Sequence, residues 1–235
     1  MKLSEKHVLV FHILFFALSI LVLFLPGSVS SGWRMFSLVF VYNGGILLFA
    51  RIWTHERWTD LWFFLFPLSC CLVFPDWFLS QVLGVVEFPA DGFPKIGTVS
   101  GYMAGLWVIP LFVSTFVSVR FRKRFSDAPA LQSYLLGGLI AFVFFLVSEE
   151  VSYLIPVWFA KNVWMFDHVA VYVLAPEFIL AVFACYAYEV CAYSSLSEKI
   201  LWAFLTMFVY LGALGFFFLL LEGNKKIGSS SVSPI

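Results

Sequence analysis

The sequence predicts an all-α fold, a multi-pass transmembrane bundle of about seven helices, and three observations lead to this prediction. The 235-residue chain is 62% hydrophobic and only 12% charged, whereas soluble domains carry about 25% charged residues. Several apolar runs approach or exceed the ~20 residues that cross a bilayer as a helix. Short polar segments, many of them rich in Gly or Pro, separate these runs. We therefore expect lipid, rather than water, to surround most of the chain.

The expected spans follow one another along almost the whole sequence, at 8–25, 36–53, 61–80, 101–119, 131–153, 169–193 and 200–221. We treat residues 1–222 as a single transmembrane domain and expect the polar tail, 223–235, to be disordered. The first run follows Lys2 and Lys6 and exceeds the about 7–15 apolar residues of a signal peptide. We interpret it as a retained span rather than a cleaved leader.

Basic residues set the expected orientation, because cytoplasmic loops of membrane proteins carry an excess of Lys and Arg. The densest basic cluster, from Arg120 to Arg124, follows the fourth span. With this cluster in the cytoplasm, the N-terminus lies inside and the C-terminus outside, in a bacterial-type inner membrane or an equivalent one. The formal net charge is zero, so no basic domain is available for nucleic acid.

Acidic residues gather at the side of the membrane that this orientation calls outer. The ionisable residues expected there, from two hairpins, are Asp76, Glu87, Asp91, Glu149, Glu150, Asp167, His168 and Glu177. An ionised carboxylate inside a membrane costs roughly 2.5–3.5 kcal/mol on insertion scales. Such a concentration of acids beside apolar spans therefore indicates a functional site.

Glu177 is the strongest single candidate for a catalytic residue. It follows Pro176 in "VLAPEFILAVFA", with apolar residues on both sides. Proline lacks a backbone N–H, so the helix can be loosened at this point. The alternative is a neutral glutamate, or one bonded to a hydroxyl such as that of Tyr172, which only holds helices together. Glu149 and Glu150 diverge by about 100° on a helix, so we expect only one of them to face the bundle centre.

Carboxyl groups and aromatic rings in one apolar site suit acid–base chemistry that needs no cofactor. A carboxyl group among apolar side chains can stay protonated near neutral pH and act as a general acid, while a second carboxylate stabilises a cation or takes a proton back. Aromatic faces also stabilise cations. The predicted catalytic residues are Glu177, Glu149, Glu150, Asp76 and Asp167. The predicted substrate-binding residues are Trp77, Trp107, Trp158, Trp164 and His168, although a histidine at a span boundary is often only a polar cap.

Metal and cofactor motifs are absent from the sequence. It contains no H-x-x-x-H, H-E-x-x-H, P-loop, G-x-G-x-x-G or G-x-S-x-G pattern. The cysteines, Cys70, Cys71, Cys185 and Cys191, lie in apolar segments without metal-ligand spacing, so we expect buried, inert thiols. We therefore expect neither a cofactor nor a metal. "YNGG" at 42–45 and "LGG" at 136–138 are interpreted as sites of close helix packing.

Two short segments hint at an internal hairpin duplication. "FPDWF" at 74–78 and "IPVWF" at 155–159 share the pattern P-x-W-F, each near the outer end of a span and each followed by an aromatic, acidic loop. Both hairpins are expected to cross the membrane in the same direction. Repeats of this kind often place a site at their interface, although a match of this length also arises by chance.

The stretch "PDWFLSQVLGVVEFPADGFPKIG" resembles the lycopene-cyclase-domain proteins, small multi-span enzymes of carotenoid synthesis, and related carotenoid hydratases. The matching residues are Asp76, Trp77, Gly84, Phe88 and Gly97 in the first hairpin, and Trp164, Phe166, Pro176 and Glu177 in the second. The resemblance covers about 76–178. It implies an isoprenoid substrate and adds Phe166 to the binding residues. The fourth span reads "SGYMAGLWVIP" where the family has proline and paired glutamates, so that half of the site is missing or is moved to Glu149 and Glu150.

Three classes of function stay open at the level of sequence. The first is a cyclase-like or hydratase-like enzyme, a lyase or isomerase, that acts on an isoprenoid or another lipid. The second is a small transporter subunit whose intramembrane acids carry protons or cations. The third is a non-catalytic membrane protein that binds a partner or has a structural role. The expected partners are membrane lipids and an isoprenoid substrate; the oligomeric state is open.

Overall fold

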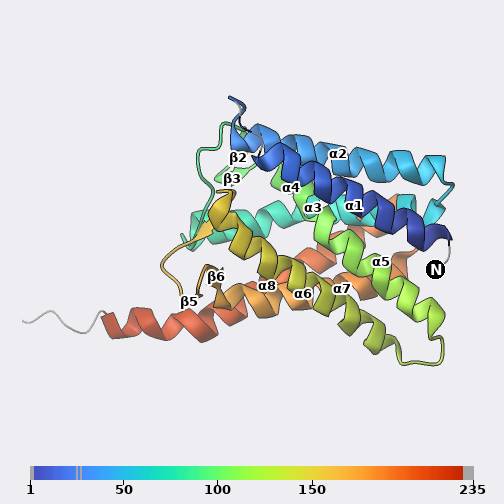
Figure 1. Ribbon diagram of the computed structural model, residues 1–235. Coiled ribbons are helices and arrows are strands. Elements are labelled where there is room, and N and C mark those ends of the chain that lie inside the picture. Colours follow the sequence, from blue (N-terminus) through green and yellow to red (C-terminus); the bar gives the residue numbers. More distant parts are fainter. Residues whose placement is uncertain (1–2, 25, 27, 230–235) are drawn as a thin grey trace, which may run out of the picture.

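The computed structural model describes residues 3–24, 26 and 28–229, and these form a bundle of long helices (Figure 1). Seven of the described helical segments are long and apolar enough to cross a membrane, which confirms the all-α fold class and the number of spans. The helices are α1 (Leu3–Phe24), α2 (Ser31–Ile52), α3 (Glu56–Trp77) with the π-helical turn η1 (Phe78–Val82), α4 (Met103–Leu106), α5 (Val108–Arg124), α6 (Ala130–Leu154), α7 (Val171–Cys191) and α8 (Leu196–Ser229). The chain has the architecture of an integral membrane protein.

Several helices extend beyond the apolar runs that predict them. α2 begins at Ser31 and α3 at Glu56, because polar and aromatic residues at a membrane interface continue the helical hydrogen bonds. The polar tail predicted for 223–235 is partly helical, since α8 continues to Ser229. The remaining residues, 230–235, lie outside the described part of the chain.

Short strands gather at one end of the bundle, which we call the strand end and define as segments 83–102 and 155–170 (Figure 1). The pair β2 (Lys95–Ile96) and β3 (Val99–Ser100) forms one hairpin, and β5 (Met165–Phe166) and β6 (Val169–Ala170) form another. Between the two segments, β1 (Val86–Glu87) pairs antiparallel with β4 (Phe159–Ala160). The start of α1 and the end of α8 lie at opposite ends of the bundle.

Helix α7 lies at the centre of the packing, in contact with α5, α6 and α8, while α3 packs on α5 and α8. Glycines allow α6 to approach its neighbours closely. A Cβ atom on Gly137 would lie 2.5 Å from Cys185 Sγ, and one on Gly138 would lie 2.5 Å from Val182 Cγ2. This confirms the close-packing interpretation of "LGG". α1 is different, because only 6% of its apolar window is buried, so it lies at the periphery beside α2.

Prolines lie in three of the helices that lead to the strand end. The ring of Pro110 is incompatible with a helical carbonyl at Leu106, and the fourth span breaks at Trp107, between α4 and α5. Pro75 precedes η1, where the wider π-helical turn ends the third span. Pro176 lies inside α7, one residue before Glu177. Trp107 thus lies at a break between two helices, whereas Asp76 and Glu177 each follow a proline inside a continuous helix.

The opposite end of the bundle is fixed by a buried ion pair. Lys199 Nζ lies 2.9 Å from Asp60 Oδ1 and also donates to the backbone carbonyls of Cys191 and Ser194. Asp60 Oδ2 accepts a hydrogen bond from the hydroxyl of Tyr188. Because both charges are paired and hydrogen-bonded, the group connects α3, α7 and α8 without leaving an uncompensated buried charge.

Candidate active site

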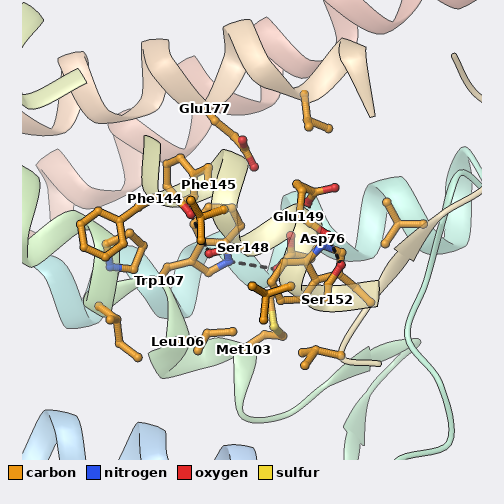
Figure 2. A pocket seen from close by; sticks show the side chains of 18 of the residues that line it. Asp76, Met103, Leu106, Trp107, Phe144, Phe145, Ser148, Glu149, Ser152 and Glu177 are labelled. Carbon is orange, nitrogen blue, oxygen red and sulfur yellow. Dashed lines mark hydrogen bonds between the residues drawn. The ribbon is translucent and has the colours of Figure 1, made fainter. Parts of the chain in front are cut away.

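A cavity of about 340 Å³ lies near the strand end, and side chains from all of the helices α1 to α8 contribute to its wall. Most of the side chains that line it are apolar, and three carboxyl residues, Asp76, Glu149 and Glu177, reach it from three different helices. Figure 2 shows Glu177 pointing from α7 towards the side chains of Trp107, Glu149 and Asp76. The lining includes no Lys, Arg or His among the described residues. The cavity thus combines an acidic character with an apolar wall.

Asp76 is held by an indole from the neighbouring span. Its side chain lies near the C-terminal end of α3 and is buried. Trp107 Nε1 donates a hydrogen bond to Asp76 Oδ2 over 3.1 Å (Figure 2). Trp107 reaches this position because the helical break described above turns its indole towards α3. The ring of Trp107 also packs against Phe145 and Tyr210, so it forms part of the cavity wall.

Glu149 has a corresponding arrangement on α6. It is buried, and Trp158 Nε1 donates to Glu149 Oε1 over 2.7 Å. Trp158 comes from the loop that joins α6 to β4. Glu150, by contrast, is only half-buried and does not line the cavity. The prediction that just one of the two adjacent glutamates faces the centre is therefore confirmed, and the inward residue is Glu149.

Glu177 differs from the other two acids, because an oxygen of its carboxyl group has no partner. Glu177 Oε2 is fully enclosed and makes no hydrogen bond within the described part of the chain. The hydroxyl of Tyr172, also in the cavity wall, is enclosed and without a partner in the same way. The alternative in which Tyr172 and Glu177 tie helices together is therefore not realised by a hydrogen bond between them. Two buried polar groups instead face a cavity that can hold a ligand.

The remaining predicted site residues lie outside the cavity. His168 Nδ1 is 3.1 Å from Glu150 Oε2 and 3.4 Å from Asp167 Oδ1, in a surface cluster at the β5–β6 turn. One ligand atom from each of these three residues lies within 4.8 Å of the others, a spacing compatible with a metal, but Asp167 is exposed and such clusters are common without an ion. Trp164 and Phe166 are exposed, the latter by 75%.

Trp77 is half-buried and also does not line the cavity. Its ring stacks on Phe74 and meets the turn at Gly97, where a Cβ atom would lie 2.9 Å from the indole. The role of Trp77 in this arrangement is to support the β2–β3 hairpin. Of the predicted binding residues, Trp107 and Trp158 are thus the two that the structure brings to the acids.

Sequence reasoning missed several side chains of the cavity wall, among them Tyr210, Ser148, Ser152 and Met103. Tyr210 is a buried polar residue in the last apolar span, which is a signal that a residue-by-residue inspection can find. Ser148 and Ser152 flank Glu149 on the same helix, with Ser152 one turn beyond it. Met103 carries no such signal, because a methionine in an apolar run is ordinary core filling.

A family model described as a domain of unknown function (DUF6989) matches residues 73–221. The match begins within α3 and includes Asp76, Glu149 and Glu177, together with both hairpins of the strand end. Neither the curated proteins nor the solved structures gave a significant match.

Proposed function

The chain belongs to the DUF6989 family, whose function is unknown, and from the geometry of the cavity we propose that it is a membrane enzyme that protonates a carbon–carbon double bond of an isoprenoid or a similar apolar lipid. One observation carries the proposal: three buried carboxyl groups from three helices line a single apolar cavity that has no basic side chain in its described wall. Acids in an apolar cavity suit proton transfer to a hydrocarbon.

The three acids have different surroundings, which suggests different roles. In a region of low dielectric constant, three neighbouring carboxyl groups cannot all be ionised without strong repulsion. A hydrogen bond from an indole N–H favours the ionised form, and Asp76 and Glu149 each accept one. Glu177 has an oxygen with no hydrogen-bond partner in the described part of the chain. We therefore assign Glu177 as the general acid and Asp76 and Glu149 as the carboxylates that stabilise a cation.

The proposed step is balanced without a cofactor. The O–H bond of the Glu177 carboxylic acid breaks, its proton adds to one alkene carbon, and the π electron pair forms the new C–H bond. A carbocation is left on the other carbon, beside the rings of Trp107 and Tyr210. A second double bond of the same lipid then attacks the cation in a cyclisation, or water does so in a hydration. The cyclised cation, or the water molecule that has added, then loses a proton to a carboxylate of the site.

An internal duplication is part of the proposal, and matched positions in the two halves support it. The hairpins β2–β3 and β5–β6 have the same register, and the left-handed residues Gly92 and Gly97 precede Asn162 and Asp167 by the same number of residues. β1 and β4, which occupy the corresponding places in the two halves, pair antiparallel, as strands related by a two-fold axis do.

The same correspondence relates the residues of the site. Asp76 precedes β1 by the same number of residues as Glu149 precedes β4. Trp107 follows β3 by the same number of residues as Glu177 follows β6. The two halves thus supply equivalent carboxyl groups, while Trp107 in one half stands where Glu177 stands in the other. A site between two repeats is common among membrane proteins.

The resemblance to lycopene-cyclase-domain proteins is compatible with this assignment for part of its residues. Asp76 and Glu177, which match the family pattern, reach the cavity, whereas Trp77, Trp164 and Phe166 do not. The basic residues Arg122 to Arg124 lie at the end of the bundle opposite the strand end. With that end in the cytoplasm, the N-terminus is inside and the site opens in the outer half of a bacterial-type inner membrane or its equivalent.

The direct test is to extract the lipids of a host that makes isoprenoid precursors and produces this protein, and to measure their masses. We expect a new lipid with an unchanged mass for a cyclisation, or a mass increased by one water for a hydration. The Glu177→Gln variant, produced at the same level, is the matched control and should lack the new lipid. Identical extracts from both hosts and from an empty-vector host, over a range of precursors, would instead favour a transporter subunit or a non-catalytic membrane protein.

A further inference from the structure

The cavity has an apolar wall that extends to the outer surface of the bundle. Phe16 of α1 and Val147 of α6 both line the cavity, yet they are 66% and 54% exposed. Phe144 and Val151, also on α6, likewise line the cavity and are exposed on the outer surface of the bundle. Because these residues lie within membrane-spanning segments, the surface that they share with the cavity faces lipid rather than water. The cavity is thus open to the bilayer between α1 and α6.

Helix α1 is the loosely packed side of this opening. Most of its surface is exposed. Near the C-terminus of α1, Arg34 of α2 donates a hydrogen bond to the carbonyl of Leu23 over 3.1 Å and so holds the two helices together. Further along, His12 Nε2 and the hydroxyl of Tyr42 are 3.0 Å apart. These contacts hold α1 against α2 and not against α6, so the gap between α1 and α6 is not closed by a described hydrogen bond.

The cavity wall contains two buried polar groups to which a ligand can hydrogen-bond. Glu177 is 5% exposed and Tyr172 is fully buried, and each has a polar oxygen that makes no hydrogen bond to any residue that the structure describes. Leaving such groups unsatisfied is costly when they are buried in a protein. A ligand hydroxyl group can accept a hydrogen bond from the Tyr172 hydroxyl, which leaves the Glu177 carboxyl group to face the carbon chain of the ligand.

The charge of the wall restricts the ligand further. Three carboxyl residues and no described basic side chain line the cavity, so a phosphate or diphosphate group meets repulsion and no counter-charge. The volume, about 340 Å³, is at the lower end of the range of roughly 300–1,000 Å³ for small-molecule pockets. A single chain with a small uncharged head fits these limits better than a phospholipid with two chains.

We infer that the cavity binds a single-chain lipid with one uncharged polar group, such as an isoprenoid alcohol, which enters from the bilayer between α1 and α6 and places its polar group at the hydroxyl of Tyr172. This inference names the substrate class of the proposed enzyme and rests on that proposal for its catalytic meaning. The binding itself does not depend on turnover.

The contact between the polar group of the ligand and the protein is tested with three probes on the purified full-length protein in detergent. The probes are farnesol, the hydrocarbon with the same carbon skeleton (farnesane), and farnesyl phosphate. Ligand-dependent rises in Tm give the apparent affinities, and comparison of variants with the same probe cancels partition into micelles. Tyr172→Phe should weaken farnesol binding roughly 5–10-fold, the value of one hydrogen bond, and leave farnesane binding unchanged.

The Tyr172→Phe variant should fold, because it removes a hydroxyl that has no hydrogen-bond partner among the described residues. Equal affinity of this variant and the wild type for farnesol would overturn the assignment of the polar group. Tighter binding of farnesyl phosphate than of farnesol by the wild type would overturn the uncharged class of ligand.

The entrance is tested with a matched pair of variants on α6. Val147→Trp places an indole at the opening, whereas Val143→Trp, one turn away, is equally lipid-exposed but does not line the cavity. We expect Val147→Trp to weaken farnesol binding several-fold and Val143→Trp to leave it unchanged. The same affinity for both variants would exclude this entrance.

Binding and catalysis can be separated in these experiments. Selective farnesol binding without any lipid conversion would support the binding site and contradict the proposed enzymatic function. Lipid conversion without selective farnesol binding would support the enzymatic function and contradict the proposed class of ligand.

Discussion

Glu177 is the residue on which the proposed proton transfer depends most directly. Glu177→Gln keeps the size of the side chain and removes its dissociable proton, so we expect product formation to fall by ~10²–10⁴-fold, the usual contribution of a positioned acid or base. The Tm should hold or rise, because the amide, unlike the carboxyl group, has no charged form to give up when the chain folds. The measurements are lipid conversion per amount of folded protein and thermal unfolding in detergent. Full activity in a folded variant contradicts the assignment.

The adjacent pair Glu149 and Glu150 allows a second test at this scale. Glu149 lies in the cavity wall and accepts a hydrogen bond from Trp158, whereas Glu150 contacts His168 at the surface. We expect Glu149→Gln to lower conversion roughly 10²-fold and Glu150→Gln to leave it close to that of the wild type. Equal losses in the two variants would place the site at the surface cluster instead of the cavity.

The sequence predicts the divergence of these two glutamates but not which of them turns inward. Helical geometry separates adjacent side chains by about 100°, and this alone leads to the expectation that one faces the centre. The choice between them depends on the rotation of α6, which is set by its contacts with α5 and α7 through Gly137 and Gly138. No local pattern in an apolar run with little periodicity contains that information.

At the scale of single elements, the sequence motif and the strand positions lead to different alignments of the two proposed halves. The shared P-x-W-F motif aligns Trp77 with Trp158, yet Trp77 ends α3 while Trp158 lies in the loop after α6. In the proposed duplication, the positions relative to β1 and β4 instead relate Asp76 to Glu149. Two-residue strands have no periodicity to detect, so the strand pairing that supports this alignment is not predictable from the sequence.

The approach of α6 to α5 and α7 leads to a prediction about stability. A Cβ atom at Gly137 would lie 2.5 Å from Cys185 Sγ and 3.2 Å from the backbone oxygen of Ser114, whereas one at Gly212 of α8 meets nothing within 4 Å. Gly137→Ala should therefore destabilise the protein by ~1–3 kcal/mol through overpacking. The matched variant Gly212→Ala should have an unchanged or higher Tm, because alanine is the better helix former. Thermal unfolding in detergent measures both, and equal Tm values would show that α6 packs more loosely.

At the scale of the whole molecule, apolar runs are sufficient to predict the seven spans, because bilayer thickness fixes the length of a crossing helix. They do not predict which spans meet around the cavity. α8, the last span, contributes Tyr210 to the same wall as Asp76 of α3 and Glu177 of α7. Such contacts between distant segments depend on side-chain packing across the bundle, and the sequence of a single span does not predict them.

The orientation of the bundle is the last property that an experiment can decide. Ser126 lies in the exposed connection between α5 and α6, next to the basic end of α5, and Lys95 is exposed at the strand end. In a background without the native cysteines, single cysteines at these positions should react with an impermeant maleimide from opposite sides of sealed vesicles. We expect the cysteine at 126 to react from the cytoplasmic face, because Arg122, Lys123 and Arg124 precede it. Labelling of both from one face would contradict the seven-span crossing pattern, while exchange of the two faces would keep the fold and place the acidic cavity in the inner half of the membrane.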